Sequence, residues 1–387
     1  MKGKFFFLAL SAMALATGCS NDEMTEVNRG DGIDFSVTAG KLTRAAATTT
    51  NSIDEFKVWA FTDNKTYMDG TPVSKEGNKW TYTGTKFWPE TPVDFFAVSP
   101  ATLQSGTVSV TNESRKIEEY VVTDGKEDLL YAANFSETKD NHATSPVKVN
   151  FRHALSQIVF KVKKTPTSSI DVKVKGIKVK GVANTATLTW ATATTGANLP
   201  EGEADTETGD SWGRWGTPTG NAEYTAVNLT EAYDVQTIPN YLTIEAGNGA
   251  LFLMPQTLDP WLTLSTDGKA SITGTARLLV NCQIKDTDSD IQLWPEEGEF
   301  GDVAISLSNP TNDPNKEDGD TSHDRWMQGK KYIYTLIFGE GGGYKPDPDD
   351  PDEPDKPTPV LVPITFTVTV DEFQDGGEYN LNVNDPE

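Results

Sequence analysis

The sequence predicts an all-β protein with two sandwich-like domains and a separate strand near the C-terminus. Short segments that alternate apolar and polar residues recur along the 387 residues, and turns rich in glycine, proline and threonine separate them. No long stretch carries the period of 3.6 residues that is typical of a helix. At roughly 150 residues per domain, the length favours two domains.

The strongest strand signal lies at residues 364–370, where Ile364, Phe366, Val368 and Val370 alternate with threonines. The segment before it, residues 339–359, is rich in glycine, proline and aspartate, so it forms no core and behaves as a spacer. A connection of this length is unusual inside a compact domain. We therefore expect this strand to complete the sheet of another molecule. The alternative is that it folds back onto its own domain.

A second segment, residues 33–39, has the same length and phase, with Ile33, Phe35, Val37 and Ala39 on one face. It is followed by Arg44 in a small and polar stretch of the kind that proteases cut. Cleavage after Arg44 would let the segment leave, and the slot would match the apolar residues of 364–370. The other interpretation is that any two sandwich strands can share this alternation.

The N-terminus is typical of an export signal. Lys2 and Lys4 precede an apolar run, residues 5–16, that is too short to span a bilayer. Small residues then precede Cys19 in a pattern that resembles the lipobox of bacterial lipoproteins. The resemblance implies removal of residues 1–18, acylation of the Cys19 sulfur by lipid such as palmitate, and anchoring to the outer membrane. A plain secretory signal is the alternative.

Charge and composition argue against several functions. The formal charge of −24 disfavours binding to nucleic acid. The histidines are His142, His153 and His323, which supply zinc sites and histidine-based catalysis poorly. We expect no cofactor and no metal. Cys282 is the cysteine left after processing, so it forms no intramolecular disulfide, and we expect it to pack as a small buried apolar residue.

Two motifs that carry chemistry in other proteins lack their usual context here. Residues 209–213 fit the Gly-x-Ser-x-Gly pattern of hydrolases but have no strand before them and no helix after them. Asp286, Asp288, Asp290 and Glu297 have the spacing of calcium ligands in an EF-hand. Because Ile291 occupies the position of the required glycine, we expect a solvated acidic loop.

Tryptophans suggest an alternative function. Trp212 and Trp215 lie in a poorly patterned stretch, residues 192–225, which we expect to be a long loop. Aromatic faces stack on sugars, so a surface lipoprotein that binds glycans and does not polymerise is the alternative, although we expect these side chains to pack in the protein. We also expect residues 172–182 and 186–190 to form a hairpin.

Several motifs that are weak individually form a more specific pattern through their order along the chain. In addition to the lipobox and Arg44, they are residues 128–132, 151–155, 254–256 and 326–334. Together they resemble the fimbrillin family, the subunits of surface fimbriae of Gram-negative anaerobes. The resemblance implies transthyretin-like β-sandwiches. We place the domains as a signal peptide at 1–18, a lipidated propeptide at 19–44, sandwiches at 45–150 and 151–338, a linker at 339–359 and a donor-type strand region at 360–387.

The resemblance also implies a function, which is a structural rather than an enzymatic one. An arginine-specific protease would cut between Arg44 and Ala45, and strand exchange would then polymerise the subunits into a fimbrium that supports adhesion at the cell surface. The partners implied are other copies of the chain, related fimbrial subunits and host proteins or glycans. A tip or anchor subunit would keep its C-terminal strand in its own domain, and that role stays open.

Overall fold

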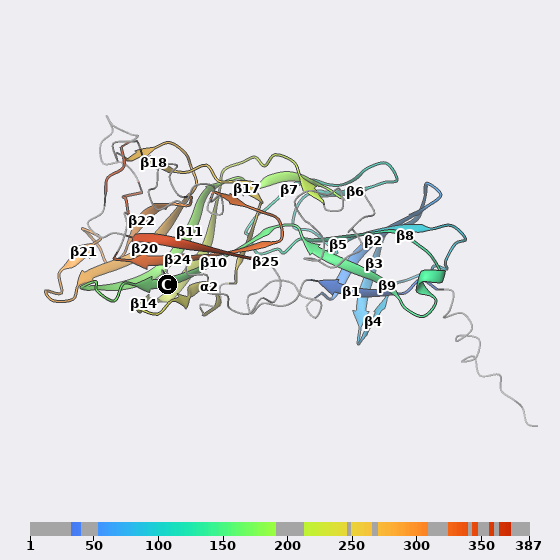
Figure 1. Cartoon of the computed structure of the whole chain (residues 1–387), viewed down its shortest axis with the longest axis horizontal. Coiled ribbons are helices and arrows are strands. Elements are labelled where there is room, and N and C mark those ends of the chain that lie inside the picture. The colour runs from blue at the N-terminus through green and yellow to red at the C-terminus, as the bar shows by residue number, and fades with distance from the viewer. Residues whose placement is uncertain are drawn as a thin grey trace, which may run out of the picture.

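The computed structural model describes residues 32–39, 53–190, 213–245, 249–264, 270–308, 324–339, 343–346, 356–359 and 364–372. These residues confirm the all-β class: within them the helical elements are a single turn, α2 (Leu242–Glu245), and the 3-10 turn η1 (Asp140–His142). The molecule is elongated, with the N-terminal strands toward one end and the C-terminal sheets toward the other (Figure 1). The transthyretin-like type and the two-domain division stay predictions.

The N-terminal half is organised by a seven-stranded sheet. Its strands, in spatial order, are β1 (Phe35–Ala39), β9 (Val147–His153), β8 (Leu130–Glu137), β5 (Val93–Ser99), β2 (Glu55–Thr62), β3 (Lys65–Glu76) and β4 (Lys79–Thr81). β1 joins parallel to β9, and the other pairs are antiparallel. The two edges, β1 and β4, contact each other, so the sheet is rolled around its own interior.

The central strands of the rolled sheet, β2, β5 and β8, are buried on both faces, which explains why they are apolar almost without interruption. On β2, Phe56 and Val58 point into the roll, whereas Trp59 and Phe61 belong to a second core outside it. Successive residues of a strand point to opposite faces, so a strand covered on both sides needs apolar residues throughout. The interior of the roll is one hydrophobic core, and the outer face is part of another.

A four-stranded sheet covers the outer face of the roll. Its strands are β13 (Arg214–Trp215), β12 (Thr185–Thr189), β7 (Arg115–Val121) and β6 (Thr107–Val110). Because β12 pairs with β7, the predicted hairpin of 172–182 with 186–190 is wrong. The long loop predicted at 192–225 is also wrong in part, since β13 and the start of β14 lie inside it. This sheet draws strands from both sides of residues 150 and 151, and the domain boundary there stays a prediction.

Two larger sheets build the C-terminal half. The first contains β15 (Asn240–Tyr241), β10 (Ser156–Lys164), β24 (Lys330–Phe338), β25 (Ile364–Glu372) and β16 (Leu251–Leu253), which pairs with β10. The second contains β14 (Ala222–Asp234), β11 (Ile170–Val182), β20 (Arg277–Asp286), β21 (Gln292–Trp294) and β22 (Gly301–Ser306). Two small ribbons complete the fold: β17 (Gln256–Thr257) with β23 (Arg325–Trp326), and β18 (Leu262–Leu264) with β19 (Ala270–Ile272).

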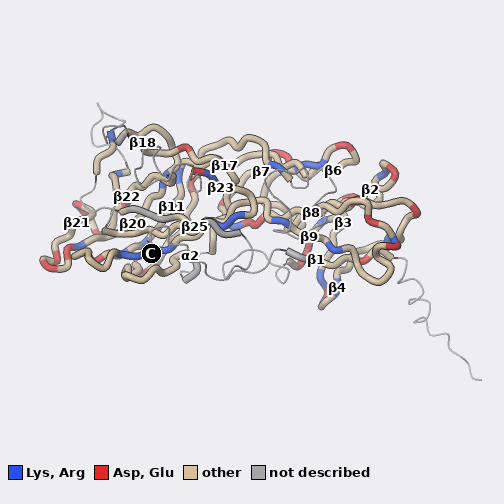
Figure 2. Tube along the Cα trace, viewed as in Figure 1, with Lys and Arg blue, Asp and Glu red and all other residues tan. Residues whose placement is uncertain are grey.

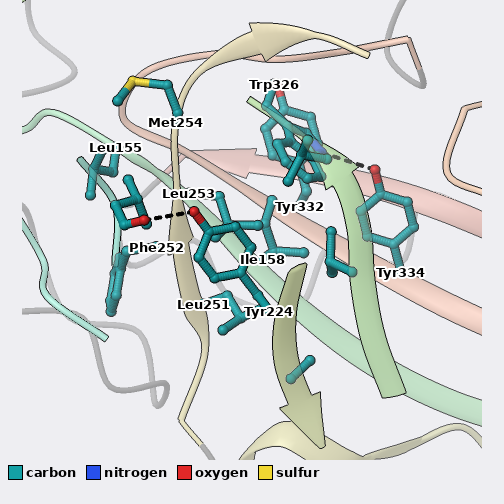
Figure 3. Close-up of a cluster of buried hydrophobic side chains, with 14 of the residues drawn as sticks. Leu155, Ile158, Tyr224, Leu251, Phe252, Leu253, Met254, Trp326, Tyr332 and Tyr334 are labelled. Atoms are coloured by element: carbon teal, nitrogen blue, oxygen red, sulfur yellow. Dashed lines mark hydrogen bonds between the residues drawn. The ribbon is translucent and has the colours of Figure 1, made fainter. Parts of the chain in front are cut away.

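The core between these sheets is continuous with the core outside the roll, and buried aromatic residues with satisfied polar groups tie it together (Figure 3). Trp326 Nε1 donates to the Tyr334 hydroxyl at 3.0 Å, and the Tyr224 hydroxyl donates to the Val122 carbonyl at 2.8 Å. Such bonds remove the cost of burying a polar group. Cys282 is fully buried in this core, which confirms its predicted packing role, and burial raises the pKa of its thiol.

Candidate functional site

The candidate site is the place where β1 lies between β9 and the segment at residues 86–87. We call it the seam of the rolled sheet. On one side β1 pairs with β9 in register, with Phe35 opposite Val147 and Val37 opposite Val149. On the other side the Ile33 amide donates to the Lys86 carbonyl at 2.8 Å. β1 therefore lies between β9 and the segment at residues 86–87 that follows β4, and removal of β1 would leave a slot between them.

The side chains of β1 form part of the core inside the roll. Ile33, Phe35 and Val37 are buried. The Phe35 ring has its centroid 5.7 Å from those of Tyr82 and Phe95 and 6.1 Å from that of Phe56, in tilted or edge-to-face geometry. Aromatic rings prefer such arrangements, and they contribute beyond simple burial of area. Phe35 is the main anchor of the strand.

Tyr82 also holds β1 through a polar contact. Its hydroxyl donates to the Ile33 carbonyl at 2.7 Å, and the Lys86 amide donates to that hydroxyl at 3.2 Å. Burial, with a smaller contribution from Asp34, raises the pKa of Tyr82. The phenol therefore stays protonated and available as a donor at neutral pH. Any strand in the slot that offers a carbonyl at this position can accept the same bond.

A hollow of about 320 Å³ opens where β1 enters the slot. It is lined by Gly32, Asp34, Trp88, His142 and the residues 143–146. Trp88 stacks flat on the His142 ring, with centroids 5.3 Å apart and planes 5° apart. His142 Nε2 lies 2.7 Å from Glu137 Oε2, which fixes the ring against the wall. We call this hollow the mouth pocket.

The C-terminal strand lies in its own chain. β25 pairs antiparallel with β24 along its length, with Ile364 opposite Phe338 and Val370 opposite Tyr332. Ile364 and Val368 are buried in the C-terminal core, as their spacing on one strand face predicts. Of the two interpretations that the sequence left open, this structure shows the strand folded back in cis. The trans arrangement remains a proposal.

The described residues of the linker before β25 contact both the body of the protein and one another, which the sequence did not predict. Tyr344 exchanges two backbone hydrogen bonds with Ala304 on β22, at 2.8 and 3.1 Å, and its ring packs beside Trp261. The Lys345 amide donates to the Thr358 carbonyl at 2.8 Å, and Tyr344 forms a β-bridge with Pro359. The linker is therefore not a free spacer over its whole length. A lone tyrosine in a segment of glycine, proline and aspartate is the signal that points to docking.

The remaining candidate residues are placed as follows. Cys19, Arg44 and Ala45 lie outside the described residues, as do Trp212 and His323, and Gly213 alone is described from the Gly-x-Ser-x-Gly pattern. Trp215 packs beside Tyr120 and donates from Nε1 to the Ala154 carbonyl at 2.6 Å, so its indole nitrogen is engaged in the protein. This packing weakens the interpretation of Trp215 as a sugar platform.

His153 and the acidic turn have structural contacts. His153 Nδ1 lies 3.0 Å from Asp128 Oδ1, with both side chains buried. Asp286 accepts from the Ser289 hydroxyl and amide and from the Asp288 amide, which lowers its pKa, and Asp290 pairs with Lys285. This acidic turn joins β20 and β21 at one end of the molecule (Figure 2). Across the described part of the chain, no group of three or more His, Cys, Asp or Glu side chains is arranged to hold a metal.

A second hollow, of about 510 Å³, lies elsewhere on the surface. Its lining includes Asp54, Glu55, Glu127 and Asp128 together with residues 99–102. The Tyr120 hydroxyl donates to Glu127 at 2.9 Å, and burial raises the pKa of Glu127. These contacts are internal to the protein. Among the residues described, no helix is long and apolar enough to cross a membrane.

The chain was compared with known families, curated proteins and solved structures. A family profile described as fimbrillin-like matches residues 43–349, and this range contains neither β1 nor β25. A fimbrial protein from Bacteroides vulgatus is 15% identical, with a TM-score of 0.46 over 89% of this chain and 100% of that one. A fimbrial assembly protein from Parabacteroides distasonis is 14% identical, with a TM-score of 0.35 over 88% of this chain and 99% of that one. No curated protein matches the sequence.

Proposed function

Because the chain belongs to the fimbrillin-like family, we propose that it is a structural subunit of cell-surface fimbriae that polymerises by strand exchange. It is exported as a lipoprotein precursor with lipid on Cys19, and an arginine-specific protease cuts it between Arg44 and Ala45. Residues 33–39 are the displaced strand. Residues 364–370, with Ile364, Phe366, Val368 and Val370, are the donor strand that another copy supplies.

The observation that carries this proposal is the position of β1 in the seam. β1 is joined to the rest of the described chain only through residues 40–52, the segment that holds Arg44. A single cut there leaves β1 bound by non-covalent contacts alone. Burial of Ile33, Phe35 and Val37 is worth roughly 1.5–3 kcal/mol for each side chain before entropy is considered. β1 is therefore held firmly in the precursor and becomes replaceable after the cut.

Loss of β1 also makes the insertion of another strand favourable. It exposes the core inside the roll, including Phe56 and Phe95, and it leaves the edge of β9 unpaired. Exposed apolar surface beside an open strand edge favours the addition of another strand. A strand with apolar residues at period two satisfies both requirements at once.

The linker controls how far the donor strand reaches. While Tyr344 and Lys345 pair with residues 358–359, only residues 360–363 connect the docked point to β25, which spans about 12 Å at roughly 3 Å per residue. Once that pairing opens, residues 346–363 span on the order of 55 Å. Exchange between copies therefore requires that the linker undock.

The proposal places the protein on the outer face of the outer membrane before cleavage and in the fimbrium afterwards. Its partners are other copies, related fimbrial subunits and the protease, with host proteins or glycans as ligands for adhesion. It assigns the chain no enzymatic activity and no cofactor. One observation favours a second candidate within the same family: because β25 is paired in cis, a tip or anchor subunit that keeps its strand is the alternative.

The test is assembly after cleavage. Full-length chain treated with an arginine-specific protease is expected to form an SDS-stable ladder on a gel, and an Arg44→Gln variant is expected to remain monomeric. The matched control is a chain truncated after residue 359 and cleaved in the same way, which should not form the ladder. Equal assembly with and without residues 360–387 would overturn strand exchange. A monomer that shifts on a polysaccharide gel would favour the glycan-binding alternative.

A further inference from the structure

The two exchanged segments share residue identities in addition to their alternation. Residues 33–39 read Ile-Asp-Phe-Ser-Val-Thr-Ala, and residues 364–370 read Ile-Thr-Phe-Thr-Val-Thr-Val. From this match we propose that the strand of a second copy fills the seam in the direction of β1. Ile364, Phe366 and Val368 then replace Ile33, Phe35 and Val37, and Pro363 enters the mouth pocket beside Trp88. The inference rests on the proposed function and defines its register and its recognition site.

Side-chain size distinguishes the two possible directions. In the direction of β1, the Phe366 ring replaces Phe35 among Phe56, Tyr82 and Phe95, whose centroids lie 5.7–6.1 Å from that of Phe35. In the reverse direction over the same seven positions, Val368 would occupy that space and Phe366 would fall at Val37. A tightly packed core tolerates neither the void nor the extra volume without loss of stability. A reversed strand that keeps Phe366 at the Phe35 position would place Pro363 at the position of Thr38, opposite Asn150 inside the ladder, where proline is disfavoured. A shift by one residue is worse, since it would turn every apolar side chain to the wrong face.

The backbone of the seam accepts the incoming strand in this register. The Ile33 amide donates to Lys86, the Ile33 carbonyl accepts from Tyr82, and the Asp34 carbonyl accepts from the Val147 amide at 2.8 Å. Ile364 and Thr365 offer the same groups at the same places. The residue before them is Pro363, which has no amide hydrogen and is tolerated as the first residue of a strand. In this register Pro363 takes the position of Gly32. The hydrogen bond to Lys86 at this end is donated by the Ile33 amide, and the Ile364 amide replaces it, so the missing amide hydrogen of Pro363 is not needed there.

The mouth pocket has the chemistry to recognise the proline. Gly32 lines it now, so replacement of Gly32 by Pro363 adds a ring beside the stacked pair of Trp88 and His142. Flat aromatic surfaces are a common docking place for prolines in extended chains, because a proline-rich segment loses little entropy on binding. The same register replaces Asp34, which also lines the pocket, by Thr365. The pocket thus loses one carboxylate, which reduces the repulsion of the acidic linker of the second copy.

Cysteine crosslinking tests the register. Continuation of the β1–β9 register places residue 34 beside Pro146, which is exposed. An acceptor chain with Pro146→Cys is cleaved after Arg44, which removes Cys19, while Cys282 stays buried. It is then mixed with cleaved donor chain carrying Thr365→Cys or, as matched controls, Thr367→Cys or Thr369→Cys, the residues that the two reverse registers place beside Pro146. The proposal expects a disulfide with Thr365→Cys and little with either control, whereas a reversed strand would crosslink through a control instead.

The pocket is tested by blocking it. Thr144→Trp fills the mouth pocket from an exposed lining position and is expected to slow assembly several-fold. Asn141→Trp, an exposed position that does not line the pocket, is the control and should leave the rate unchanged. The effect of Thr144→Trp should shrink when the donor carries Pro363→Gly. Equal slowing with both donors would show that the pocket does not receive Pro363.

These outcomes separate the inference from the function it rests on. If the chains form the ladder and the crosslink appears mainly with Thr367→Cys or Thr369→Cys, or with none of the three donors, the register is wrong while strand exchange stands. If the parent chain forms no ladder after cleavage, the proposed function fails and the register falls with it.

Discussion

Phe35→Ala should destabilise the uncut precursor and have no effect on the assembled, cleaved protein. Phe35 is 4% exposed and packs on three aromatic rings in the core of the roll. Removal of a buried phenylalanine side chain costs about 3–5 kcal/mol, which corresponds to a fall in Tm of about 6–20 °C for a body of this size. After cleavage and exchange, residues 33–39 have left, so the substitution no longer touches the folded protein.

The assay is thermal unfolding followed by circular dichroism, before and after cleavage at Arg44. The matched control is Phe56→Ala, because Phe56 is also buried in the same core but remains in the body of the protein. Phe56→Ala should therefore lower Tm in both states, and Phe35→Ala only in the uncut state. An uncut Phe35→Ala chain with the Tm of the parent would refute the role of β1 in the core. A persistent defect in the cleaved polymer would refute its departure.

Three further outcomes are expected. Tyr344→Ala should remove the ring that packs beside Trp261 and so weaken the docking of the linker on β22, where the backbone bonds to Ala304 remain. Ladder formation after cleavage should then be several-fold faster in densitometry of timed gel samples, and an unchanged rate would mean that linker docking does not limit exchange. Burial raises the pKa of Tyr224 in the folded state, so its contribution to stability is complete below about pH 10 and is lost as the pH rises further, because the unfolded chain releases the proton first. Tyr224→Phe should reduce this loss of unfolding free energy above about pH 10, measured by urea unfolding at several pH values. An unchanged loss would contradict the role of Tyr224. Burial also raises the pKa of the Cys282 thiol, so Cys282 should resist a thiol reagent until the chain unfolds, and rapid labelling of native protein would contradict its placement.

Local patterns predicted the strands that matter for the site. Residues 33–39 and 364–370 both show strict alternation, and in the structure Ile33, Phe35, Val37, Ile364 and Val368 are buried as that pattern requires. The same reasoning failed for residues 172–190. β11 and β12 are adjacent in sequence, but β11 pairs with β14 and β20, and β12 pairs with β7. Alternation shows which face of a strand is apolar, but it contains no information about which other strand will cover it.

The amino-acid sequence alone determined the all-β class, the two matching strands, the basic residue between the first strand and the body, and the acidic linker. Each follows from composition or from a period of two residues, which are local properties of the chain. Only the tertiary structure decided that β1 lies in the seam between β9 and the segment at residues 86–87, that Trp88 and His142 form a pocket at its end, and that Tyr344 docks the linker. These features bring together residues that are tens of positions apart, and their energy depends on contacts that exist only after the sheets have folded and packed.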